Sequence, residues 1–278
     1  MINMIKADFY RIVRGTGIYI AFVIILLMIG LDIYTVEAGS LGMHIESQIG
    51  AESGLDEMSY EEIQDLSISD YRRIQLKTKN SKLDREILAE NINLYYTFIF
   101  AAALGIAVDF SGSCIKNTLS SAISRKKYFF SKLVFVTLCC LILFFFNTYA
   151  AYFANIVFNN RNLASDIGTV TKISLMQLPP MLAIVSILTG FAFAFKKTAA
   201  FNTVSIPFIL LAQMLLNLLG TFFKIPAEVF EYELQRMILR LAMEPSAKYI
   251  MQSYAVCAVI IIIFTLIGWF SFKKSEIR

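Results

Sequence analysis

Residues 133–158 read LVFVTLCCLILFFFNTYAAYFANIVF and contain no charged side chain. An α-helix rises about 1.5 Å per residue and the apolar core of a bilayer is about 30 Å thick, so this stretch predicts a membrane-spanning helix. An open sheet would leave backbone groups unpaired in lipid, and the alternating pattern of a membrane barrel is absent. Five more stretches have the same character: 15–34, 92–110, 173–195, 199–223 and 249–272. The sequence therefore predicts an all-α integral membrane protein with six transmembrane helices.

The composition agrees with this fold class. Apolar residues make up 57% of the chain and charged residues 17%, against about 25% charged in soluble domains. The one polar piece of any size, residues 35–91, has too few aromatic residues to build a core of its own. We therefore expect a single six-span domain over residues 1–278.

The distribution of basic residues predicts the orientation in the membrane. If the N-terminus is cytoplasmic, the inside segments carry two acids, Asp8 and Glu276, against thirteen bases. The positive-inside rule then places both termini in the cytoplasm. The thirteen bases are Lys6, Arg11, Arg14, Lys116, Arg125, Lys126, Lys127, Lys132, Lys196, Lys197, Lys273, Lys274 and Arg278.

Two segments outside the spans have amphipathic helical patterns. In residues 1–14, Ile2, Ile5, Phe9 and Ile12 recur at helical spacing, with the charged residues expected elsewhere on the wheel. This predicts an interfacial helix in the inner headgroup layer, or simply a basic anchor. The pattern in residues 224–248 fits a short helix on the outer surface or one that dips back into the bundle, and the sequence leaves both open.

The predicted outer loop, 35–91, is acidic, with twelve acids and six bases. Such a loop can attract a cationic ligand over long range, although it can also be a solvated cap. The residues expected to capture a cationic substrate are Glu52, Asp56, Glu57, Glu61, Glu62 and Asp65.

Polar residues inside the predicted spans are few. Gln213 and Asn217 share one face of the fifth span, and Asn147 lies in the third. Such groups either bond neighbouring helices or line a translocation path. Asp109, at the inner end of the second span, is expected to reach water.

Signals for enzyme chemistry are missing. The four cysteines form no C-x-x-C and the single histidine, His44, cannot form a metal site alone. No glycine is followed by lysine, so the phosphate-binding loop G-x-x-x-x-G-K-[ST] is absent. We expect no catalytic residue, no metal, no cofactor in this chain and no nucleic-acid partner.

The predicted inside loop, 111–132, is basic and has an apolar helical face formed by Ile115, Leu119, Ala122 and Ile123. An exposed face of this kind suits docking into a groove of a partner protein. On composition alone, an anchor to lipid phosphates is the better explanation of the charges.

This loop resembles a segment of known transporters. Two stretches are similar to ABC-2 type ABC transporter permeases of Gram-positive bacteria, as is the six-span layout. They are Lys6-Ala7-Asp8-Phe9-Tyr10-Arg11, and Gly112-x-x-Ile115-Lys116-Asn117-x-Leu119 followed by Ile123-Ser124-Arg125, Tyr128-Phe129 and Ser131-Lys132.

The resemblance implies a multi-pass permease of the bacterial cell membrane that pairs with a second permease copy or paralogue. ATP and Mg²⁺ would be bound by separate ABC ATPase subunits. It also implies that the loop after the second span contains the ATPase-coupling helix. The residues at matching positions are Ile115, Lys116, Asn117, Leu119, Ile123 and Arg125.

The long acidic outer loop favours the members that handle peptides, as in antimicrobial-peptide or bacteriocin export and immunity, over sugar exporters. The alternative function is a membrane-embedded sensor or scaffold that binds an extracellular ligand without transport. An ion-coupled transporter fits less well, because carboxylates at mid-membrane are lacking.

Overall fold

The computed structural model describes residues 2–37, 88, 94–111, 115, 123–159, 166–223, 227–230, 232–242 and 246–274. Every regular element in these ranges is a helix, as the sequence predicts. In chain order the helices are α1 (Ile2–Arg14), α2 (Gly17–Glu37), α7 (Leu94–Ala102), the π-helical turn η2 (Ala103–Ala107), α8 (Val108–Ser111), α10 (Arg125–Asn159), α11 (Ile167–Phe195), α12 (Thr198–Phe223), α13 (Ala227–Phe230), α14 (Leu234–Ala242) and α15 (Ala247–Lys273).

Three of the described helices, α10, α11 and α15, are long and apolar enough to cross a membrane. A fourth candidate is the pair α1 and α2, which is bent by 64°. Thr97–Phe110 and Thr198–Ile209 are shorter apolar helices. The described residues therefore have the character of a helical membrane protein with three or four candidate spans.

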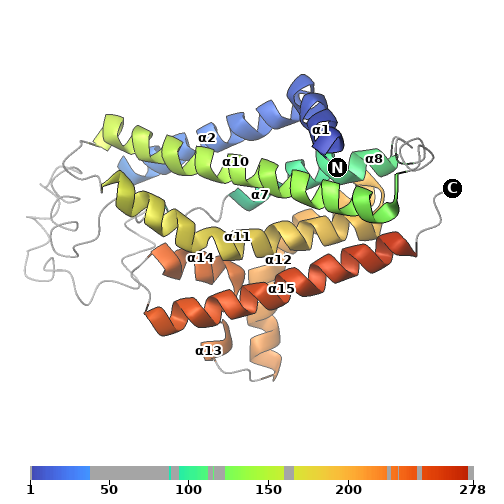
Figure 1. The fold of residues 1–278 in the computed structure, drawn as a ribbon. Helices are drawn as coiled ribbons and strands as arrows, with labels where there is room; N and C mark the ends of the chain where they lie inside the picture. Colours follow the sequence, from blue (N-terminus) through green and yellow to red (C-terminus); the bar gives the residue numbers. More distant parts are fainter. Residues whose placement is uncertain are drawn as a thin grey trace, which may run out of the picture.

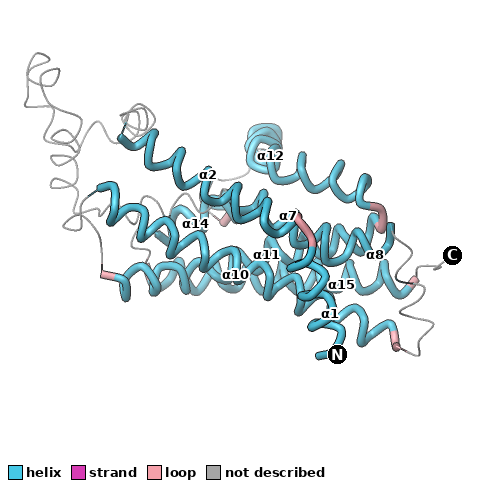
Figure 2. The backbone as a smooth tube through the Cα atoms, turned by 90° about the horizontal axis from the view of Figure 1, so that it is seen from above, coloured by secondary structure: helices cyan, strands magenta, loops and turns pink. Residues whose placement is uncertain are grey.

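The long helices lie side by side in one bundle. Helix α11 packs between α10 and α15, and α2 lies along α10 (Figure 1). The start of α1, the end of α8, the start of α10 and the end of α15 all lie at one end of the bundle, in both Figure 1 and Figure 2. At this end the Arg125 Nη1 donates a hydrogen bond to the Lys273 carbonyl oxygen over 2.7 Å, which joins α10 to the end of α15.

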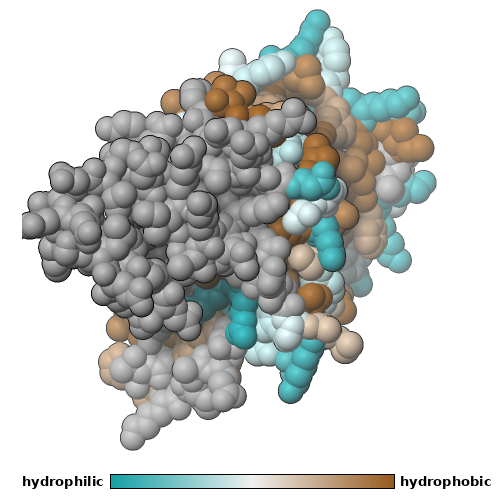
Figure 3. Space-filling view, turned by 90° about the vertical axis from the view of Figure 1, so that its left-hand side faces the viewer, coloured by the Kyte–Doolittle hydropathy of each residue, from teal (hydrophilic) through white to brown (hydrophobic). Residues whose placement is uncertain are grey.

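The opposite end, where α11 and α15 begin, is seen in Figure 3. The residues of this face that are coloured by hydropathy include both hydrophilic and hydrophobic side chains. Asp166 and Ser246 begin α11 and α15 as N-caps, because their side chains accept hydrogen bonds from the backbone N–H groups of Gly168 and Tyr249. Polar residues thus begin both long helices at this end.

Helix α14 packs against α11 of the bundle. Met237, Ile238 and Leu241 are fully buried. The Glu233 carboxylate accepts hydrogen bonds from the backbone N–H groups of Gln235 and Arg236 at 3.3 Å and so caps the start of the helix.

The predicted fifth span is helix α12, but it does not run straight along the bundle. Its later part leaves the layer of α10, α11 and α15 and runs toward α13 (Figure 1). Pro207 lies inside α12, where a proline removes a backbone hydrogen bond and commonly kinks a helix. Phe222 and Phe223, near the end of α12, are 80% and 72% exposed, so the described residues cover little of this part.

Helix α11 contains a proline pair, Pro179 and Pro180. The Met176 carbonyl would normally accept a hydrogen bond from the N–H of residue 180 or 179, and prolines have none. The Tyr254 hydroxyl of α15 donates to this carbonyl oxygen over 3.1 Å. Tyr254 therefore replaces the hydrogen bond that the prolines remove, in a setting where an unpaired carbonyl is costly.

We predict that Tyr254→Phe destabilises the protein by about 1–3 kcal/mol, because it leaves the Met176 carbonyl unpaired. In a Pro180→Ala background the helix supplies its own N–H, so the same change should cost much less. Unfolding by SDS in mixed micelles gives the four free energies of this cycle. Tyr232→Phe is the control, since Tyr232 donates to Gln252 at an exposed site. If Tyr254→Phe lowers the free energy of unfolding equally in the natural chain and in Pro180→Ala, then Tyr254 does not replace the hydrogen bond that Pro180 removes.

Candidate functional site

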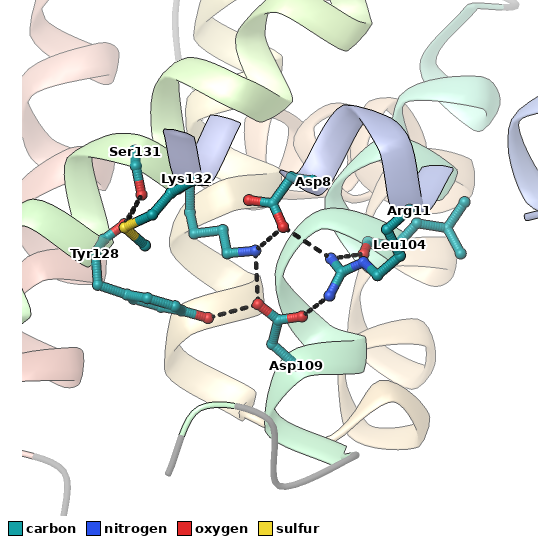
Figure 4. Close-up of polar contacts among 8 residues, drawn as sticks. Asp8, Arg11, Leu104, Asp109, Tyr128, Ser131 and Lys132 are labelled. Carbon is teal, nitrogen blue, oxygen red and sulfur yellow. Dashed lines mark hydrogen bonds and ion pairs between the residues drawn. The ribbon is translucent and has the colours of Figure 1, made fainter. Parts of the chain in front are cut away.

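Five polar side chains form a cluster at the base of the 111–132 segment (Figure 4), four of them buried and the fifth, Arg11, 39% exposed. The cluster draws two residues from α1, one from α8 and two from α10. We call it the charge cluster, and its members are Asp8, Arg11, Asp109, Tyr128 and Lys132. The cluster lies at α8, where the segment begins, and in the first turns of α10, where the segment ends.

The α1 contribution comes from the face that packs on the bundle. Asp8 follows Ile5 by three residues and precedes Ile12 by four, so it lies within the apolar stripe of α1. Asp8 is 7% exposed, and Phe9 packs edge-on against Phe135 of α10 with ring centroids 5.0 Å apart. The prediction that Asp8 lies off the apolar stripe of α1 is wrong. Ile5, Phe9 and Ile12 of this stripe pack against the core of the bundle.

Asp109 receives the largest number of donors. Its carboxylate accepts hydrogen bonds from Arg11 and, over 2.8 Å, from the Tyr128 hydroxyl, and it lies 2.6 Å from the Lys132 Nζ. It is 4% exposed, so the prediction that Asp109 reaches water is wrong. Burial is possible because three donors replace the water that a carboxylate needs.

The π-helical turn η2 precedes Asp109 and takes part in the same network. Arg11 Nη2 donates to the Leu104 carbonyl oxygen, within η2, over 3.0 Å. A π-turn adds a residue to the helix and so rotates the positions after it; such turns recur at functional sites. Arg11 thus bonds both the π-turn and the side chain of Asp109.

Lys132 joins the two acids. Its Nζ lies 2.7 Å from the Asp8 Oδ1 and 2.6 Å from the Asp109 Oδ2. The lysine side chain is 3% exposed, although the sequence placed it among the basic residues of an inside loop. Helix α10 begins at Arg125 rather than at the predicted residue 133, so Lys132 is a helical residue inside the bundle.

The cluster is electrically neutral, since two carboxylates face one guanidinium and one ammonium. Burial raises the pKa of Asp8, and Lys132 and Arg11 oppose this rise. The Asp8 Oδ2 accepts no hydrogen bond from the described residues. Buried ion pairs contribute little net stability but become very costly when one partner is lost, so they favour one specific arrangement. The cluster can therefore fix three helices relative to one another.

The predicted coupling residues are only partly described. Ile115 is 3% exposed, and Ile123 is half-buried and packs against the core. The expectation that this apolar face is free in the chain alone is therefore wrong for both, because their side chains complete the core beside the cluster. Arg125 is exposed and bonds the end of α15. Lys116, Asn117 and Leu119 lie outside the described residues.

The structure describes little of the other predicted site residues. Asn147 is half-buried in α10. The side chains of Gln213 and Asn217 lie outside the described part, as do the six acids of the outer loop, from Glu52 to Asp65. Within the described ranges no group of three or more His, Cys, Asp or Glu side chains could hold a metal ion.

Two features of the interior were not expected from the sequence, although each has a signal in it. The charge cluster had a sequence signal, an acid within the apolar stripe of residues 1–14. The second feature is Gln177 in α11, which is fully buried and donates to the Leu88 and Ile238 carbonyl oxygens over 2.9 Å each. A glutamine two residues before a proline pair in an apolar span was the available signal.

The long apolar helices of the described residues are those of a helical membrane protein. The chain belongs to the family DUF2705, described as a protein of unknown function, which matches residues 85–278. The match includes Asp109, Tyr128 and Lys132, whereas Asp8 and Arg11 precede it. No curated protein and no solved structure matches the chain.

Proposed function

We propose that this chain is the transmembrane permease subunit of an ABC-2 type ABC transporter in a bacterial cell membrane. In this proposal it exports a peptide or another amphipathic substrate, using ATP that separate ATPase subunits hydrolyse with Mg²⁺. The chain itself is then not an enzyme, and it works as a dimer with a second copy or a paralogue.

One observation carries the proposal: both flanks of the 111–132 segment are bonded into the bundle. Asp109 precedes the segment, and Arg125 and Lys132 follow its central part. Asp109 and Lys132 pair with each other and with α1, while Arg125 bonds the end of α15. A segment that receives force from a partner needs such fixed ends, because a loosely attached loop would absorb the motion. A lipid anchor has no such requirement.

We also propose six spans with both termini inside. The additional spans are the helix from α7 to α8 and helix α12, beside α2, α10, α11 and α15. The gathering of α1, α8, the start of α10 and the end of α15 at one end of the bundle supports this topology. We expect a single cysteine at Ser121 to be labelled only from the cytoplasmic side and one at Glu62 only from outside. Labelling of position 121 in intact cells would reject the topology.

The proposed function predicts a bound ATPase. Affinity purification of the tagged chain in mild detergent should bring down an ABC ATPase subunit, and the complex should hydrolyse ATP. A sensor or scaffold would purify without one. Purification without an ATPase, under conditions that preserve the native membrane complex, would overturn the permease proposal.

We predict that Leu119→Asp weakens this association, because a carboxylate placed against an apolar groove costs several kcal/mol unless it is paired. Ile123 is not used in this test, because it packs against the core of the chain itself. Leu119→Met is the matched control, since it keeps an apolar side chain of similar size. The measurements are the amount of co-purified ATPase and the thermal stability of the permease. Unchanged association with Leu119→Asp would favour the lipid-anchor interpretation of the segment.

A further inference from the structure

Helix α1 is continuous with α2 in the chain but is attached mainly to other helices. Its buried face contacts α10 through Phe9 on Phe135 and through Asp8 on Lys132. Arg11 attaches it to Asp109 and Leu104 of the second predicted span. The side-chain hydrogen bond between α1 and α2, by contrast, is exposed to solvent. The Tyr19 hydroxyl of α2 donates it to the Val13 carbonyl oxygen of α1 over 2.9 Å. The chain bends by 64° between the two helices.

The joint between α1 and α2 contains two glycines, Gly15 and Gly17. The side chain of Leu104 packs closely against Gly17, since a Cβ at Gly17 would lie 2.4 Å from the Leu104 Cδ1. Leu104 thus contacts the start of α2 with its side chain, while its carbonyl binds Arg11. A displacement of η2 and α8 would therefore act on α2 at two points, through Leu104 directly and through α1.

We propose that α1 and the two flanks of the 111–132 segment move as one rigid unit. Asp8 and Arg11 are then positioning residues that transmit a displacement of this segment to α2 through the joint at Gly15–Gly17. The charge cluster holds the unit together, because separating α1 from it breaks the bonds of Asp8 to Lys132 and of Arg11 to Asp109 and Leu104. The role in transport rests on the proposed function, whereas the rigidity of the unit is a property of the chain alone.

The first test is hydrogen exchange of the full-length chain in nanodiscs. Arg11→Met removes the bonds to Asp109 and Leu104 and keeps a long side chain. We expect backbone amides of α1 to exchange about tenfold faster or more in this variant, while α2 and α11 stay protected. Lys6→Met is the matched control, since Lys6 lies on the exposed face of the same helix. Unchanged protection of α1 in Arg11→Met would overturn the rigid unit.

The second test restores the link by another route. The Met4 Sδ and the Ser131 Oγ lie 3.9 Å apart across α1 and α10, so a cysteine pair at these positions can be cross-linked. In the complex with its co-purified ATPase, Arg11→Met should lower the rate of ATP hydrolysis without lowering the amount of ATPase bound. The cross-link should restore that rate, and a thiol reductant should remove the rescue when a reducible cross-link is used.

The outcomes separate this inference from the proposed function. If no ATPase co-purifies, the proposed function fails, while the exchange experiment still decides whether α1 belongs to the unit. If the ATPase binds and the cross-link inactivates the protein without the Arg11 change, then α1 must detach during the cycle and the transmission role is rejected. A loss of ATP hydrolysis in Arg11→Met that the cross-link cannot restore would also reject it.

Discussion

Replacing Asp109 by Ala should destabilise the protein by about 3–5 kcal/mol, the usual cost of removing one partner from a buried set of ion pairs. Asp8 is then the one carboxylate left in the cluster beside two cations, Lys132 and Arg11. The change removes an acceptor of Arg11, the carboxylate that accepts the hydrogen bond of the Tyr128 hydroxyl, and one of the two carboxylates beside Lys132. Because Lys132 is almost fully buried, water cannot replace the lost carboxylate. The expected result is early unfolding of the bundle end that contains α1.

The unfolding can be followed with a thiol-reactive dye, since Cys139, Cys140 and Cys257 are buried and free. A double variant, Asp109→Asn with Lys132→Met, serves as the matched control. It removes one charge of each sign and leaves Asp8 paired with Arg11, so it should be much more stable than Asp109→Ala. If both variants lose the same stability, packing around Asp109 matters and the excess positive charge does not.

The sequence predicts the long helices well because hydropathy is local information. The predicted span 249–272 is helix α15, Ala247–Lys273, and the predicted span 173–195 lies within α11, Ile167–Phe195. Each apolar run is long enough to determine its own helix, whatever its neighbours are. Boundaries fail where a charged residue lies inside the bundle. Helix α10 begins at Arg125, eight residues before the predicted start, with the Ser124 hydroxyl accepting from the Lys127 N–H. It can include Lys132 inside the bundle because carboxylates far away in the chain neutralise this lysine.

The charge cluster could not be assembled from the sequence alone. Lys132 is separated from Asp8 by 124 positions and Arg11 from Asp109 by 98, so no local pattern pairs them. A positive-inside count treats Lys132 as a loop charge, and a hydropathy window treats Asp109 as the end of a span. Both residues are instead paired inside the bundle. Similarly, Ile115 has the spacing of a docking face, but its side chain is needed in the core.

The close approach of α11 and α15 depends on two glycines and gives the second large effect. A Cβ on Gly190 would lie 2.9 Å from the Phe264 backbone carbonyl oxygen, and one on Gly268 would lie 3.3 Å from the Gly190 Cα. Backbone atoms cannot move aside as a flexible side chain can, so any added atom must push the helices apart. In lipid, such close contacts between small residues are a main source of helix association.

We therefore expect Gly190→Ala to cost about 1–3 kcal/mol and Gly190→Leu more, since overpacking rises with side-chain size. Gly30→Ala in α2 is the matched control, because no atom lies within 4 Å of the added Cβ. There the change should be neutral or stabilise the helix by about 0.5–1 kcal/mol, the usual penalty of a helical glycine. SDS unfolding compares the three variants. Equal effects of Ala at positions 190 and 30 would mean that helix propensity, and not the contact of α11 with α15, determines the result.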